Sequence, residues 1–311
     1  MKSSYLQYLN LPMKMNPICY YHNPCADGWW AAYAVWKQYP DAEFVGATHG
    51  RKFDISNCAD RDVIIVDFTF GIEQTNELCE LARTVTVLDH HKSAMGAFEE
   101  IKLPNLTTVF DMSRSGAQIA WEFFHDTPVP EVINYVADRD LWRNVLPHTK
   151  VVNAGLHFTI NELDFAKMSR IINTNAIDQM KLIGESVTMV QNREVEIAVK
   201  YHSLCNWTVG EKTYRVRISN GKRQLRSDIG NELVKLGDCD FAVVWTYKFP
   251  QNEFWLSLRS CDEMTDVSQV ADQFCDRQGR PGGGHRNAAG CVLWSDVGMN
   301  LADYFVPMQG M

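Results

Sequence analysis

The sequence lacks several features that would assign it to a class at once. Its nine cysteines include no Cys-x-x-Cys pair, so neither a disulfide framework nor a zinc ribbon is expected, and a reducing cytoplasm is the predicted location. No stretch approaches the roughly 18 apolar residues that a membrane span needs, and the N-terminal segment has no apolar run of signal-peptide length. We therefore expect a cytoplasmic protein with no membrane partner.

The sequence also lacks an excess of basic residues. It has 30 Lys and Arg against 38 Asp and Glu, a formal net charge of −8. A surface that holds long duplex DNA through its phosphates would normally be basic, so this class of partner is not expected. A small phosphorylated substrate remains compatible, and acidic residues can also hold cations. The oligomeric state is left open, a homodimer included.

What the sequence has is a regular alternation of apolar strands and helices, followed by a change of character. Its 311 residues, 46% of them hydrophobic, suffice for two domains. Strands are predicted at 18–21, 43–48, 62–68 and 85–88, and helices at about 28–39, 72–83, 114–126, 130–142 and over most of 162–203. From about 205 the segments are alternating and aromatic-rich, with helices at 225–236 and 267–277. The predicted fold is an α/β domain with a parallel sheet, residues 1–200, joined by a helical linker to a smaller mixed α+β domain, residues 201–311.

Polar residues follow the predicted parallel strands where each strand ends. These residues are His22 and Asp27 after the first strand, Asp67 after the third, and Asp89, His90 and His91 after the fourth. The carboxyl ends of parallel strands meet at one sheet edge, where function gathers. Clustered carboxylates repel one another unless a cation relieves them, and mixed carboxylate and imidazole ligands suit manganese, iron, cobalt or zinc better than calcium. Taken singly, each residue has a plainer interpretation as a turn former or helix cap; Asp27, for example, could cap its own helix.

A glycine-rich segment, PGGGHRNAAG at 281–290, stands near the end of the chain. Successive glycines let backbone N–H groups approach an anion closely, so a phosphate-binding loop is predicted. Arg259, at the end of the predicted strand 253–260, lies nearby in the sequence. The alternative interpretation of three glycines is a flexible turn.

Five motifs in order resemble the DHH phosphoesterase superfamily, with its C-terminal DHH-associated domain. They are HNPCADG (22–28), VDF (66–68), LDHH (88–91), ADRDLW (137–142) and GGGHRNAAG (282–290). The motifs are individually short, but their order and spacing are specific. The similarity covers the chain from about residue 18 to about residue 295.

The resemblance implies hydrolysis of phosphoester bonds, with a site in the cleft between the two domains and usually two Mn²⁺ ions, Mg²⁺, Co²⁺ or Zn²⁺ being alternatives. His91 and Asp67 would be catalytic, His91 contacting the phosphate. The metal ligands it implies are His22, Asp27, Asp67, His90 and Asp138, with Asp67 bridging the two ions. The substrate contacts it implies are Arg259, Gly283, Gly284, His285 and Ser115. Asp89 would orient its two histidine neighbours.

One position departs from the family pattern. Many members have Asp-x-Asp in the first motif, and here the earlier position is Cys25. Either the thiolate ligates a metal, which would favour zinc or iron, or water fills the position and that metal binds weakly.

The expected substrate is a short oligonucleotide or small nucleotide, such as adenosine bisphosphate or a cyclic dinucleotide. The alternatives are a RecJ-like single-strand exonuclease, a pyrophosphatase, and a nucleotide- or RNA-binding module with impaired catalysis. The densest basic segment, RVRISNGKRQLR at 215–226, is either a solvated strand edge or a platform for substrate phosphates.

Overall fold

The computed structural model of the protein describes residues 16–48, 53–91, 95–96, 98, 101–249, 251–261, 263–276, 282–294 and 301–308. The chain divides into two compact units, Met1–Thr188 and Met189–Met311. The boundary between them lies within α8 (Ile177–Lys200), the helix that also ends at the position where the sequence predicted a boundary. No helix of the described residues is both long and apolar enough to cross a membrane.

The first unit is built on a five-stranded sheet in the order β2-β1-β3-β4-β5, and every neighbouring pair is parallel. Its strands are β1 (Ile18–His22), β2 (Glu43–Ala47), β3 (Asp62–Val66), β4 (Thr84–Asp89) and β5 (Leu106–Phe110). Its helices are α1 (Ala26–Gln38), α2 (Ile72–Leu81), α4 (Gly116–Phe124), α5 (Glu131–Asp140), α6 (Thr149–Thr159) and α7 (Phe165–Asn173), with a short 3₁₀ turn at Ser56–Cys58. The predicted α/β domain with a parallel sheet is confirmed, although β5 and α6 were not predicted.

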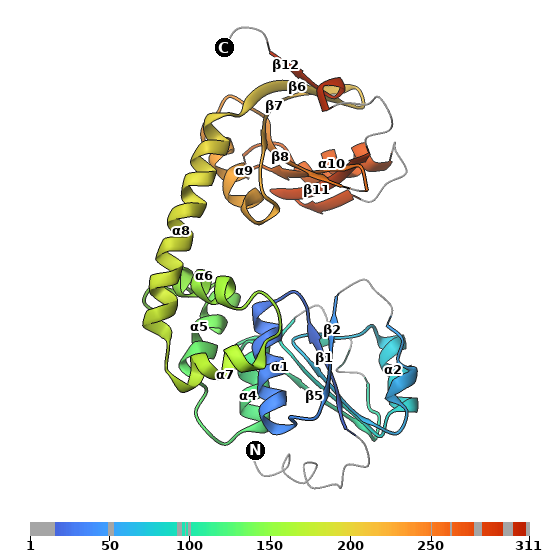
Figure 1. Ribbon diagram of the computed structural model, residues 1–311. Coiled ribbons are helices and arrows are strands. Elements are labelled where there is room, and N and C mark those ends of the chain that lie inside the picture. Colours follow the sequence, from blue (N-terminus) through green and yellow to red (C-terminus); the bar gives the residue numbers. More distant parts are fainter. Residues whose placement is uncertain are drawn as a thin grey trace. The chain divides into compact units, whose positions relative to one another are not determined.

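Both faces of this sheet are covered by helices. Alternate residues of each strand point to opposite faces, so each strand contributes side chains to both. In β3, Ile64 and Val66 belong to one apolar cluster, which includes α1, α4 and α5, whereas Val63 and Ile65 belong to a second cluster that includes α2. Figure 1 shows α1 and α4 on one side of the sheet and α2 on the other. Burial on both faces explains why the apolar run of β3 is continuous.

The second unit is a mixed sheet of seven strands in the order β10-β11-β9-β8-β7-β6-β12, in which only the β7–β8 pair is parallel. Its strands are β6 (Ser203–Val209), β7 (Lys212–Asn220), β8 (Phe241–Lys248), β9 (Glu253–Arg259), β10 (Gly282–His285), β11 (Ala288–Trp294) and β12 (Phe305–Pro307). The helices α9 (Arg226–Lys235) and α10 (Val267–Asp276) accompany 3₁₀ turns at Arg223–Leu225 and Leu301–Asp303. The predicted mixed α+β fold is confirmed.

The glycine-rich segment is not a loop in this unit. Gly282–His285 form the edge strand β10, which pairs antiparallel with β11 so that Gly284 lies opposite Ala289. At Gly284 the backbone has φ of +150°, and an added Cβ would lie 2.5 Å from the carbonyl oxygen of Ala288. Glycine is therefore required there by close strand pairing, and the predicted loop is corrected to a hairpin strand, whereas phosphate binding by this segment stays a prediction.

Candidate metal centre

The first motif places His22 at the end of β1 and Asp27 in the first turn of α1. Asp27 does not cap its own helix, because Cys25 occupies the cap position and makes no side-chain cap hydrogen bond. Instead the buried Asp27 carboxylate accepts hydrogen bonds from the backbone nitrogens of Gly116, at 2.6 Å, and Ala117, at 3.1 Å. These are orphan donors of the first turn of α4, so the helix end fixes the carboxylate in place.

Asp67 follows β3 and lies between two histidines. Its Oδ1 is 3.1 Å from Nε2 of His90, and its Oδ2 is 3.4 Å from Nδ1 of His22. The residue has a left-handed backbone, with φ of +53°, and its amide donates to the carbonyl of Leu88 in the neighbouring strand. A Cβ on Gly116 would lie 2.5 Å from the Cβ of Asp67, so glycine is needed there to leave room for the carboxylate.

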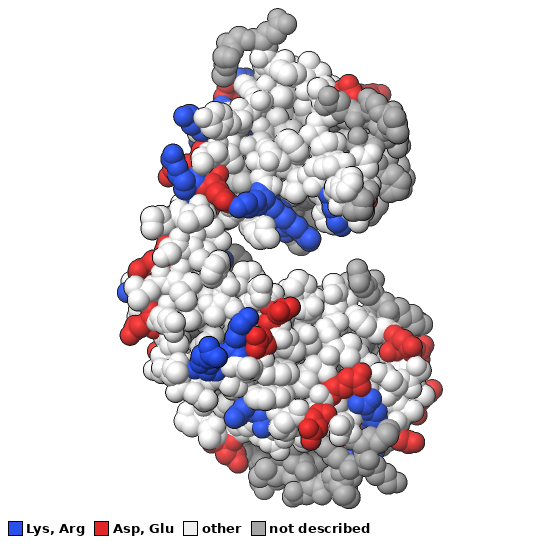
Figure 2. All heavy atoms as spheres, in the orientation of Figure 1, with Lys and Arg blue, Asp and Glu red and all other residues white. Residues whose placement is uncertain are grey.

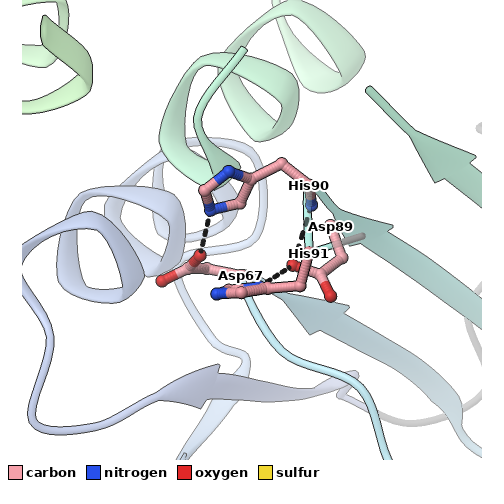
Figure 3. Close-up of side chains that lie close together, drawn as sticks. All are labelled: Asp67, Asp89, His90 and His91. Atoms are coloured by element: carbon pink, nitrogen blue, oxygen red, sulfur yellow. Dashed lines mark hydrogen bonds and ion pairs between the residues drawn. The ribbon is translucent and has the colours of Figure 1, made fainter. Parts of the chain in front are cut away.

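The Asp-His-His sequence ends β4, and its three side chains have different positions. Asp89 is fully buried, and its Oδ1 accepts from the backbone nitrogen of His90, at 2.8 Å, and lies 2.7 Å from Nδ1 of His91. Figure 3 shows His90 directed at Asp67 and His91 held beside Asp89. The two imidazoles are 4.5 Å apart between ring centres. Asp89 thus has the geometry to orient the imidazole of His91 and the backbone of His90.

The two acidic residues at the end of α5, Asp138 and Asp140, have contacts that differ from those predicted from the sequence. Asp138 is buried and accepts from the backbone nitrogens of Val145, at 3.0 Å, and Leu146, at 3.1 Å, and from the hydroxyl of Thr149. The carboxylate near the histidines is that of Asp140, whose Oδ2 is 3.5 Å from Nε2 of His90. By its contacts Asp140, and not the predicted Asp138, lies among the donor atoms, and which of the two binds a metal stays a prediction.

The donor atoms form overlapping groups in which all atoms lie within 4.8 Å of one another. These groups are His22, Cys25 and Asp67; Asp27, His90 and Asp140; and Asp67, Asp89, His90 and His91. Asp67 joins the first two groups, since its two carboxylate oxygens approach a histidine in each. The geometry brings together His22, Asp27, Asp67 and His90 from the predicted set and adds Cys25 and Asp140.

Electrostatic repulsion within this cluster is strong. Burial and the neighbouring charges of Asp67 and Asp140 raise the pKa of Asp27 well above its usual value. Burial and Asp67 likewise raise the pKa of Asp140. Burial alone would raise the pKa of Asp67 too, but hydrogen bonds from His22 and His90 outweigh it and hold the pKa below its usual range. The cluster therefore has an excess of buried carboxylates that positive charge must offset.

The predicted substrate contacts lie in both units. Ser115 is fully buried at the N-cap of α4, where its hydroxyl accepts from the backbone nitrogen of Gln118. In the second unit, Arg259, Gly283 and Gly284 line a hollow of about 820 Å³. His285 is exposed and does not belong to the described lining of that hollow.

Comparison with known proteins gives relatives of limited similarity. No protein-family model matches the chain. Uncharacterized protein R106 of Acanthamoeba polyphaga mimivirus is 29% identical in an alignment of 290 positions that covers 88% of this chain. The chain spans 66% of the length of that relative, slightly less than two thirds.

Among solved structures, a pGpG-specific phosphodiesterase, PggH from Vibrio cholerae, matches with a TM-score of 0.47 and 13% identity, over 90% of this chain and 94% of that one. A putative family II inorganic pyrophosphatase from Methanococcus jannaschii matches with a TM-score of 0.31 and 13% identity, over 94% of this chain and 97% of the other. An uncharacterized protein from Helicobacter pylori G27 gives 0.37 and 16%, over 92% and 94%. At these similarities, the activity has to be argued from the residues of this chain.

Proposed function

We propose that this chain is a DHH-type, metal-dependent phosphoesterase that hydrolyses short oligonucleotides or small nucleotides. The observation that carries the proposal is the pair of donor groups joined at Asp67, with three buried or half-buried carboxylates and two imidazoles that come from strand ends, the start of α1 and the end of α5. An ion pair with a purely structural role would need one carboxylate for one imidazole, whereas three carboxylates lie around His90.

The residues fit divalent cations by their chemistry. Asp27, Asp67 and Asp140 lie around the imidazole of His90, and burial together with their mutual repulsion raises the pKa values of Asp27 and Asp140. Oxygen and imidazole donors together suit manganese, our proposed metal, and also cobalt or zinc. Two such ions would supply Lewis-acid stabilisation of the charge on a phosphoryl group.

The protein's own groups then divide the remaining tasks. His22 would hold one ion with Asp67, and Asp27, His90 and Asp140 would hold the other. His91 would contact the reacting phosphate, since it is the more exposed of the paired histidines and the carboxylate of Asp89 raises its pKa. A protonated imidazole there stabilises phosphate charge and can donate a proton to a leaving oxygen.

The Cys25 thiol offers a third donor to the His22 and Asp67 group. Burial raises its pKa, with the charges of Asp67 and Asp27 contributing, so this thiol ionises only when a cation displaces its proton. If it stays protonated, the first site binds its ion weakly, and a binding module with impaired catalysis becomes the second candidate function.

One experiment tests the proposal directly. The purified chain would be loaded with Mn²⁺, and its metal content would be measured by mass spectrometry. Hydrolysis would be assayed on bis-p-nitrophenyl phosphate and on 5′-phosphorylated RNAs and DNAs of two to ten nucleotides, beside cyclic dinucleotides, adenosine bisphosphate and inorganic pyrophosphate. We expect near-stoichiometric metal and turnover of short nucleotides. Stoichiometric metal without any turnover would replace the enzyme by the binding module, and turnover of pyrophosphate alone would replace it by a pyrophosphatase.

A further inference from the structure

The second unit contains a trough whose floor is the face of its sheet formed by β8, β9 and β11. Residues of β9 alternate between the two faces, so Leu256 and Leu258 are buried in the core whereas Trp255, Ser257 and Arg259 line the hollow of about 820 Å³. Pairing places Gly290 of β11 opposite Ser257. The middle of the floor is therefore made of small side chains, with large ones at its ends.

A cation pair stands at each end of this floor. At the end that lies nearer the glycine strand β10, Arg259 is joined by Arg226 of α9, and the lowered pKa of Arg259 reflects burial and the charge of Arg226. The stem of Arg259 packs on α9, since a Cβ on Gly230 would lie 2.6 Å from its Cγ. Its guanidinium donates to the hydroxyl of Ser227 and to the carbonyl of Leu258.

At the other end of the floor, Arg223 and Lys248 both make cation–π contacts with Trp255. The guanidinium carbon of Arg223 lies 5.2 Å from the centre of the indole, and the ammonium nitrogen of Lys248 lies 4.7 Å from it. The indole is itself held, because its Nε1 donates to a carboxylate oxygen of Glu253 at 2.8 Å. Cation–π contacts thus gather two long, flexible cations at one place.

These four cations are not used in ion pairs. Within the part of the chain that the structure describes, no carboxylate lies within ion-pair distance of Arg223, Arg226, Lys248 or Arg259, and the described lining contains no acidic residue. Other cations of the segment 215–226 do have partners: Arg215 pairs with Asp238, Arg217 bonds the carbonyl of Gly237, and Lys222 pairs with Glu194. The basic segment therefore divides into structural cations and trough cations.

The spacing of the two pairs indicates the kind of ligand. Trp255 and Arg259 are four residues apart on one strand, which corresponds to about 13 Å. One phosphate cannot contact both ends, whereas a chain of phosphates can. The small floor between them leaves room for flat groups such as bases.

We propose that the Arg223–Lys248 pair on Trp255 is a distal phosphate subsite, which makes the trough select single-stranded oligonucleotides longer than a dinucleotide. The inference rests on the proposed function in taking the bound oligonucleotide as the substrate. Binding itself requires neither metal nor hydrolysis.

The test measures binding by the full chain in EDTA, with fluorescently labelled 5′-phosphorylated dinucleotide and tetranucleotide RNAs as probes. The distal variant is Arg223→Gln with Lys248→Gln. The matched control, Arg193→Gln with Lys235→Gln, removes two exposed cations that pair with Glu196 and Glu232 outside the trough. Melting temperatures by circular dichroism would establish that all variants are folded.

We expect the distal variant to bind the tetranucleotide about 25-fold more weakly at 0.1 M salt, because a salt slope of about 0.7 per contact corresponds to about fivefold for each of two contacts. Dinucleotide affinity and the control variant should stay within about twofold of wild type. Trp255→Leu should weaken tetranucleotide binding by about two- to fivefold, as loss of a cation–π contact implies, and Trp255→Phe should retain most of it.

Equal losses for both probe lengths, or equal losses in the control variant, would overturn the distal subsite. Inorganic tripolyphosphate that displaces the tetranucleotide as well as an unlabelled tetranucleotide does would show that the trough recognises charge alone, and would overturn the assignment to oligonucleotides. Hydrolysis of bis-p-nitrophenyl phosphate or of short nucleotides by the Mn²⁺-loaded chain separates the two proposals. Its absence refutes the proposed function, whereas the length-dependent binding loss can still be observed.

Discussion

The two units contain charged sites of opposite sign that are built in opposite ways. The candidate metal centre of the first unit collects carboxylates and imidazoles from the ends of β1, β3 and β4, the start of α1 and the end of α5, and these segments are far apart in the sequence. The trough of the second unit takes its floor from adjacent strands and its cations from β8, β9 and the segment that begins α9. On the face drawn in Figure 2, Lys and Arg lie beside Asp and Glu on both units.

The difference shows how each charge excess is stabilised. In the first unit the carboxylates are buried and fixed by backbone donors, as Asp27 is by α4, so only a cation held in a set geometry can satisfy them. In the second unit the cations lie on long stems at the rim of an open trough, where solvent screens them. The first site should therefore tolerate almost no substitution, and the second should lose affinity in small steps.

The largest expected effect is that of Asp67→Ala. Because Asp67 approaches His22 and His90 with its two oxygens, its removal should lower bound manganese at both positions and reduce kcat/KM by about 10⁴-fold, the equivalent of several kcal/mol of lost charge stabilisation. Tetranucleotide binding in EDTA should be unchanged if the trough is independent. Metal content and rate at wild-type levels would refute the shared-ligand arrangement.

His91→Ala should have the next largest effect and should separate chemistry from metal binding. Asp89 holds the ring of His91 at 2.7 Å, and we expect a loss of kcat of about 10²–10⁴-fold, typical of a positioned acid–base group. Manganese content, measured by mass spectrometry, should remain within experimental error of wild type. A variant that loses metal but keeps its rate per bound metal would instead make His91 a ligand.

The acidic pair of α5 provides a matched comparison. Asp140→Asn should lower metal affinity and kcat/KM, by at least the 10–100-fold that is usual for groups which support a metal site. Asp138→Asn should leave the bound metal unchanged and lower the free energy of unfolding by about 1–3 kcal/mol, because three donors lose a charged acceptor. Denaturant unfolding and metal analysis on both variants check this assignment, and the reverse pattern would restore Asp138 as the ligand.

The sequence predicted most of the strands and most of the residues that lie together at the sheet edge, because the strands follow from the period of apolar residues and the cluster from the order of the strands. Asp67 and His90 stand directly after continuous apolar strands, and the parallel arrangement brings such ends together. The choice between Asp138 and Asp140 could not be predicted: residues two apart on a helix point about 200° apart, and which one faces the cluster depends on how α5 packs.

The trough cations were harder to predict for a related reason. Arg223 and Lys248 both contact the ring of Trp255, and nothing in the sequence spacing of these residues indicates this. The glycines of β10 were mistaken for a loop, because three successive glycines favour a loop unless a neighbouring strand approaches as closely as β11 does.

A smaller effect should come from Gly116→Ala, which tests how tightly the centre is packed. The added Cβ would lie 2.5 Å from the Cβ of Asp67, so we expect a loss of about 1–3 kcal/mol in unfolding free energy, together with weaker metal binding. Gly71→Ala is the control, since no atom lies within 4 Å of its added Cβ. Equal behaviour of the two variants in denaturant titrations would mean that Asp67 can move without cost.

The smallest expected effect is that of lengthening the substrate beyond the trough. Once both cation pairs are filled, further nucleotides meet a protein whose net charge is −8, and repulsion should offset any additional contact. We therefore expect kcat/KM for a twenty-nucleotide single strand to be no higher than for a five-nucleotide one at 50 mM salt. Raising the salt to 200 mM should narrow the difference in kcat/KM between the two strands, because the Debye length falls to about 7–8 Å and the outer charges are then screened. The comparison is made on wild type and on the distal variant at equal enzyme concentration. Faster hydrolysis of the longer strand at both salt concentrations would show that the substrate extends past the trough, and would favour a RecJ-like exonuclease over an enzyme of short oligonucleotides.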